Sequence, residues 1–162
     1  MIPEVQGVLS ELRVLWDEIE ALARRLPPQA LIYRHGAGFN SISVLVTHLA
    51  GSQRWWIGEV VANRAMHRDR DAEFRAEDVD QSVLTARLHD AAGLVGEILD
   101  TLTSEMLDQT RLYRGQPVTV RWILLRLLGH AARHVGQMQI VEKLWASQGG
   151  AAPEQASQGK GR

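Results

Sequence analysis

The sequence predicts an all-α protein: a four-helix bundle followed by a disordered C-terminal tail. Apolar residues recur at spacings of three and four along four long segments, which is the period of an α-helix. No run of alternating apolar and polar residues bounded by turn residues, which would predict a strand, accompanies them. With 162 residues, the chain is long enough for one domain with a substantial core. We therefore expect a bundle domain over residues 1–147 and a flexible tail over residues 148–162.

The first helix is predicted from Val5 to Leu26, and Pro27-Pro28 ends it because proline cannot continue a helix. A glycine-containing loop follows. The second helix begins at a cap supplied by Asn40 or Ser41 and runs to about Met66, with a broad apolar face.

Two further helices complete the bundle. The segment from His67 to Glu77 alternates opposite charges, which predicts an exposed connection. A capping arrangement at residues 78–81 starts the third helix, which ends near Thr103. After a turn-containing connection over residues 104–117, the fourth and longest helix covers residues 118–145. Connections of this length suit an up-and-down or a crossover bundle.

The amino-acid composition excludes several classes of functional site and partner. Cysteine is absent, which excludes disulfides, iron–sulfur clusters, thiolate zinc sites and a cysteine nucleophile, so nitrogen and oxygen must hold any metal. The 18 basic and 19 acidic residues are mixed along the chain, so no strong field favours nucleic acid. No segment approaches the roughly 18 to 20 apolar residues of a membrane span, and the N-terminus does not resemble a signal peptide. We therefore expect a cytoplasmic protein with no membrane partner.

Three histidines form the main candidate site. The fourth helix contains HAARH, in which His130 and His134 project from one face about 6 Å apart along the axis. His48 is the third candidate, because it lies mid-helix in the apolar run VLVTHLAG. By spacing alone, a hydrogen-bonded core histidine is the alternative for His48. Three imidazoles suit zinc, nickel, iron or copper, of which we expect zinc or nickel.

The pattern differs from that of the zinc proteases. In HExxH the residue after the first histidine is the glutamate base, whereas Ala131 occupies that position here, which disfavours peptidase chemistry. Gln137, one turn past His134, is placed to bond a metal-bound water or substrate, or has no role. Spacing does not choose which arginine holds a substrate carboxylate; the candidates are Arg54, Arg121, Arg126 and Arg133.

Three blocks of the sequence resemble the DinB/YfiT-like superfamily of four-helix-bundle metalloenzymes: NSISVLVTHLAGSQRWW around His48, VTVRWILLRLLGHAARH, and the following HVGQMQIVEKL. The superfamily places one ligand in the second helix and an H-x3-H pair in the last. The matching residues here are His48, His130 and His134. Members include transferases that couple low-molecular-weight thiols, such as bacillithiol or mycothiol, to electrophiles. The resemblance implies a metal-dependent thiol S-transferase with a small-molecule substrate and a low-molecular-weight thiol as cosubstrate.

Other readings remain open at this point. The chain also suits a non-catalytic metal-stabilised bundle or a small-ligand-binding module, while an all-α DNA-associated protein fits its near-neutral charge poorly. Broad apolar faces with Trp16, Trp122 and Trp145 predict a homodimer packed through helices. No side chain beyond the three ligands is identified as catalytic.

Overall fold

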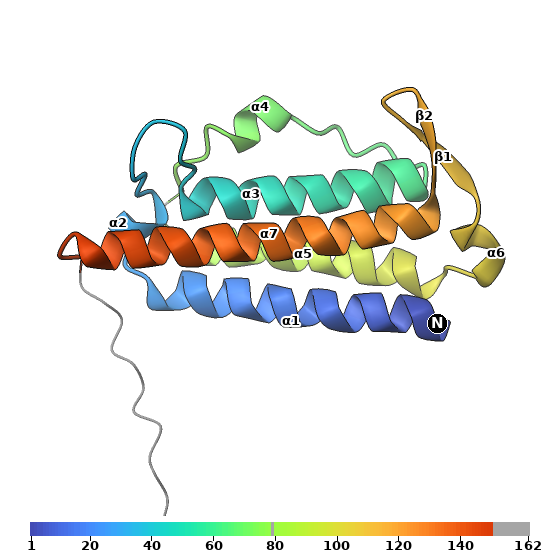
Figure 1. Ribbon diagram of the computed structural model, residues 1–162, viewed down its shortest axis with the longest axis horizontal. Helices are drawn as coiled ribbons and strands as arrows, with labels where there is room; N and C mark the ends of the chain where they lie inside the picture. The colour runs from blue at the N-terminus through green and yellow to red at the C-terminus, as the bar shows by residue number, and fades with distance from the viewer. Residues whose placement is uncertain (79, 151–162) are drawn as a thin grey trace, which may run out of the picture.

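The computed structural model describes residues 1–78 and 80–150, and four long helical segments form a bundle (Figure 1). They are α1 (Pro3–Arg25), α3 (Ile42–Gln53) with its π-helical continuation η1 (Arg54–Val61), α5 (Gln81–Asp100) and α7 (Val120–Ser147). α1 and α3 each pack against both α5 and α7. α1 and α7 run in one direction and α3 and α5 in the other, so a long crossover connects α3 to α5 (Figure 1). The four-helix bundle predicted from sequence is therefore confirmed, in its crossover form.

The core lies along the axis of the bundle and is made by the apolar faces of all four long helices. Each fully buried leucine or isoleucine stabilises the fold by about 1.5 to 3 kcal/mol relative to an exposed one. The largest fully buried side chains are Leu12, Ile19, Leu26, Leu31, Ile42, Leu45, Leu49, Ile57, Leu84, Leu88, Leu99 and Leu107.

Side-chain caps fix where the helices begin. Of the two predicted caps for α3, Ser41 is the one used, and its hydroxyl accepts from the backbone N–H of Val44. Asp80, two residues later than predicted, caps α5. Thr119 caps α7 by accepting from the N–H of Trp122. The second long segment ends at Val61 rather than Met66, and its last eight residues are π-helical, a rare form that is frequent at functional sites.

The prediction of an exposed connection over residues 67–77 is wrong in one respect. The crossover chain contains a short helix, α4 (Arg70–Glu73), that lies over α3 (Figure 1). Most charged side chains of the crossover chain are exposed, but Glu73, in α4, is only 6% exposed, and Arg68, just before α4, is half-buried. The two bond to each other, and a paired charge can be buried where a lone one cannot.

The connection before α7 corrects a second expectation, the absence of strands. After the short helix α6 (Ser104–Leu107), strands β1 (Thr110–Tyr113) and β2 (Gln116–Thr119) pair antiparallel. Arg114 and Gly115 both have positive φ, as a two-residue hairpin turn requires. Strands of four residues are too short to show a clear alternation in the sequence.

The remaining segments are brief. A short helix, α2 (Pro28–Leu31), follows α1 within the connection predicted as a loop. The predicted tail lies outside the described residues from position 151 onward. Among the helices of residues 1–78 and 80–150, none is both long enough and apolar enough to cross a membrane.

Candidate metal centre

His48, His130 and His134 lie together between two neighbouring helices. His48 comes from α3, and the other two project from adjacent turns of α7, which packs against α3. One ring nitrogen of each residue lies within 4.8 Å of the other two. The centroid of the His48 ring lies 5.3 Å from that of the His130 ring and 5.2 Å from that of the His134 ring. The structure thus brings all three predicted residues to one point.

Hydrogen bonds on the far side of two rings fix their tautomers. Nδ1 of His48 lies 2.9 Å from Oε2 of Glu73, and Nδ1 of His134 lies 2.7 Å from Oε1 of Gln137. A carboxylate or amide oxygen accepts, so each Nδ1 carries the proton and each Nε2 is left unprotonated, with a lone pair. This is the usual arrangement of a metal-ligating histidine, in which one nitrogen faces the ion and the other donates to an acceptor.

His130 is held differently. Its Nε2 lies 3.0 Å from Nε2 of His134, while its Nδ1 is buried and has no partner in the described part of the chain. Burial, followed by electrostatic interactions with His134, His48, Arg126 and Arg133, lowers the pKa of His130 to about 3. Burial is also the main cause that lowers the pKa of His134. Both imidazoles are therefore neutral near pH 7.

The donor set fits a divalent transition-metal ion. The three ring nitrogens lie close together, and the facing Nε2 atoms of the two α7 histidines can share a single proton at most. A borderline cation such as zinc would satisfy both lone pairs together with that of His48.

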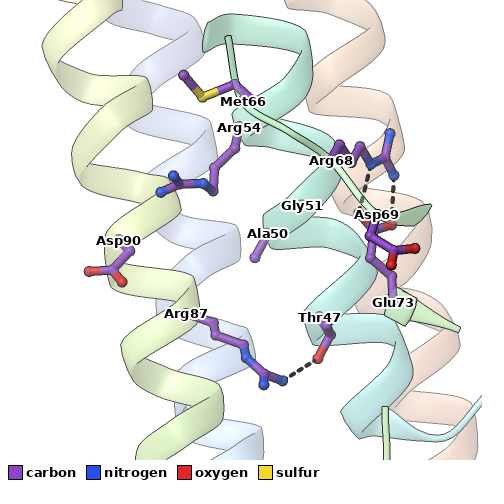
Figure 2. Close-up of a pocket in the computed structure, with 10 residues that line it drawn as sticks. All are labelled: Thr47, Ala50, Gly51, Arg54, Met66, Arg68, Asp69, Glu73, Arg87 and Asp90. Carbon is purple, nitrogen blue, oxygen red and sulfur yellow. Dashed lines mark hydrogen bonds and ion pairs between the residues drawn. The ribbon is translucent and has the colours of Figure 1, made fainter. Parts of the chain in front are cut away.

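Glu73 is a further residue of the candidate site, and the sequence did not reveal it. Its carboxylate also accepts from Nε and Nη2 of Arg68, at 2.6 Å and 2.7 Å (Figure 2). Burial opposes its ionisation, but the bonds to Arg68 and His48 outweigh burial and lower its pKa. A charged run with alternating signs gave no signal that one carboxylate would fold over His48.

Glycine at position 51 makes room for this carboxylate. A Cβ atom on Gly51, in α3, would overlap Oε1 of Glu73. Gly51 and Glu73 also border a groove of about 360 Å³ between α3, α5 and the crossover chain (Figure 2). At the far side of this groove, Arg87 donates to the hydroxyl of Thr47.

The other three histidines lie away from this site, on the surface. His35 bonds the hydroxyl of Tyr33, His89 lies 3.1 Å from a carboxylate oxygen of Glu20, and His67 is exposed. Gln137 does not face the point where the three ligand nitrogens converge, since its amide oxygen accepts from the outer nitrogen of His134.

The fold is shared with solved bacterial structures. A conserved protein from Enterococcus faecalis superposes with a TM-score of 0.75 at 17% identity, covering 91% of this chain and 99% of its own. A DinB-like protein from Bacillus cereus gives a TM-score of 0.72 at 14% identity, covering 93% and 96%. No curated protein matches the chain.

These likenesses define the class: a four-helix bundle of the DinB-like fold, with three histidines placed to hold a metal ion. Residues 4–149 match the family model described as a protein of unknown function (DUF1572), which is a DinB-like family. The chain belongs to that family.

Proposed function

We propose that this protein binds one divalent transition-metal ion, zinc or nickel, through His48, His130 and His134. We further propose that it is an enzyme of the low-molecular-weight-thiol S-transferase type. The observation that carries the proposal is the convergence of three imidazoles from two helices, with one ring nitrogen of each within 4.8 Å of the others. Two of them donate a proton to a fixed acceptor on the side away from that point.

Three protein ligands leave at least one coordination position for another molecule, as in catalytic rather than structural zinc sites. A divalent ion in such a site lowers the pKa of a coordinated thiol or water, so that the nucleophilic anion forms near neutral pH. The chain's part is to hold the ion with uncharged donors, which leave its positive charge undiminished. Its lack of cysteine agrees with a thiol that arrives as a cosubstrate.

Metal analysis of untagged protein tests the first part of the proposal. We expect one equivalent of a divalent metal per chain, strongly reduced in His134→Ala. His89→Ala is the matched control, because His89 pairs with Glu20 on the surface and should leave the metal content unchanged. Metal-free wild-type protein, or a His134→Ala variant that binds metal as tightly as the parent, would exclude the site.

Thiol consumption tests the second part. The metal-loaded protein is incubated with a low-molecular-weight thiol and a general electrophile, with the chelated protein as the blank. Turnover that depends on the metal supports the transferase assignment. A full equivalent of metal, with a raised melting temperature but no turnover across a panel of thiols, would favour the non-catalytic metal-stabilised bundle.

A further inference from the structure

Arg126, one turn before His130, has no hydrogen-bond acceptor in the described part of the chain. The half-buried arginines of residues 1–78 and 80–150 are Arg68, Arg87, Arg111, Arg121 and Arg126. The first four each donate to a carboxylate or carbonyl oxygen of the chain. Arg126 makes no hydrogen bond or ion pair in the described part of the chain, and its Nε is buried without an acceptor. A partly desolvated guanidinium with no acceptor is unfavourable unless something else supplies one.

Three aromatic rings surround this guanidinium. Its Cζ lies 5.7 Å from the ring centroids of Trp56, Tyr113 and Trp122. The rings come from η1, β1 and α7, and each lies within 6.2 Å of the next. Cation–π attraction stabilises the positive charge and fixes its position, but aromatic faces cannot accept its N–H groups in the plane of the guanidinium. The charge is therefore held in place while its buried Nε–H has no acceptor among the described residues.

The position of Arg126 relates it to the histidines. It lies four residues before His130 on α7, so both residues project from the same face, about 6 Å apart along the helix axis. The other arginines considered from sequence are less suited. Arg121 is paired with Glu4 and Asp108, and Arg54 lies on the groove between α3 and α5. Arg133 is exposed.

We infer that Arg126, held by Trp56, Tyr113 and Trp122, binds a carboxylate of the substrate or thiol cosubstrate whose reacting end lies at the three histidines. A guanidinium presents paired donors that match the two oxygens of a carboxylate. The aromatic rings around the guanidinium suit the apolar atoms between that carboxylate and the reacting group. This inference rests on the proposed function and adds a substrate class to it: molecules with a carboxylate a few bonds from the reacting atom.

The test compares two thiols of nearly equal size. Cobalt-loaded protein is titrated with mercaptopropionate and with its neutral carboxamide, and binding is followed by the sulfur-to-cobalt absorption band. The proteins are wild type, Arg126→Gln, Arg126→Lys and Arg133→Gln, the last as an exposed arginine on the same helix. For each protein, the affinity for mercaptopropionate is divided by the affinity for the carboxamide, and this ratio is compared between proteins. The difference in acidity between the two thiols affects every protein equally and therefore cancels.

We expect wild type and Arg133→Gln to favour the carboxylate by roughly tenfold to a hundredfold more than Arg126→Gln does, as for a hydrogen bond to a charged group. The carboxamide should bind all four proteins about equally, and Arg126→Lys should keep part of the preference. Unchanged cobalt spectra before thiol addition establish that the variants fold and hold the ion. Equal preference in wild type and Arg126→Gln would overturn the inference and leave the metal-site proposal standing. Failure of wild type to bind cobalt or either thiol would overturn both.

Discussion

Replacing Glu73 by Gln should weaken metal binding although residue 73 contributes no donor atom to the ion. The substitution keeps the size of the side chain but removes its charge and one of its two acceptor oxygens. In the native protein those oxygens serve three bonds, one to His48 at 2.9 Å and two to Arg68. The glutamine amide can accept from only one of these partners with its oxygen and presents an N–H₂ group to the other.

The expected loss of metal affinity follows from the loss of the hydrogen bond between His48 and residue 73. When the amide oxygen stays with Arg68, the N–H₂ group faces the Nδ1–H of His48, and two donors repel. The imidazole must then rotate or change tautomer, which withdraws its Nε2 lone pair from the site. Loss of such a supporting partner reduces metal affinity about 10- to 100-fold, or roughly 1.4 to 2.7 kcal/mol.

Competition between the protein and a chromophoric chelator for zinc gives the affinities directly. Glu97→Gln is the control, because the pair that Glu97 forms with Arg64 is solvent-exposed and should change zinc affinity less than twofold. A double-mutant cycle with Arg68→Gln should show coupling, since Arg68 acts on His48 through the same carboxylate. Zinc affinity of Glu73→Gln within twofold of wild type would refute the idea that Glu73 orients His48.

Three further outcomes follow from the same geometry. Gly51→Ala should lower zinc affinity by displacing Glu73, although alanine ordinarily stabilises a helix by about 1 kcal/mol over glycine. Gly93→Ala is the control, because the space around Gly93 is open, and its melting curve should show only the stabilisation of the helix. The metal-free protein should lose stability, measured by urea unfolding, as pH falls from 6.5 toward 3, and His130→Gln should reduce this loss. Zinc at a hundred times its dissociation constant should stabilise the fold by about 2.7 kcal/mol and raise the melting temperature by roughly 5 to 11 °C, and chelator should reverse the shift.

The sign of the pH effect comes from the lowered pKa of His130. Its ordinary value of 6.5 applies in the unfolded chain and falls to about 3 in the folded protein. Between these values the unfolded chain binds a proton that the folded chain does not, so acid favours unfolding. The stability is fully present above pH 6.5 and is lost progressively below it. A flat or opposite slope would mean that the imidazole is solvated in the folded state.

Sequence periodicity predicted the four long helices because each buries an apolar face, and burial repeats at the helical period in the chain itself. It also marked His48, His130 and His134 as candidates, since a polar residue in an apolar run departs from a strong local pattern, and the resemblance to the DinB/YfiT-like superfamily made His48 the partner of the other two. Both patterns are local and can be recognised in the sequence without the three-dimensional structure. Boundaries shifted by a few residues where a cap decided between neighbours, as with Asp80.

What sequence could not supply are the pairings between distant segments. Glu73 lies among many charges, and only the path of the crossover chain selects it for burial against a histidine 25 residues earlier. Tyr113, from the unpredicted hairpin, reaches Arg126 for the same reason. The predicted homodimer stays a prediction, but Trp16 is unsuited to it, since the residue is only 7% exposed and its indole N–H donates to Gln53.

The crossover topology and the metal site are connected by a simple requirement. Because α3 and α5 run in the same direction, the chain between them must return along the whole length of the bundle (Figure 1). The return path passes over the middle of α3, where His48 lies, and places Glu73 on its outer nitrogen. An up-and-down bundle would join these helices by a short turn at one end and leave that nitrogen to solvent. The topology therefore anchors one of the three histidines, and Gln137 anchors the second from within α7.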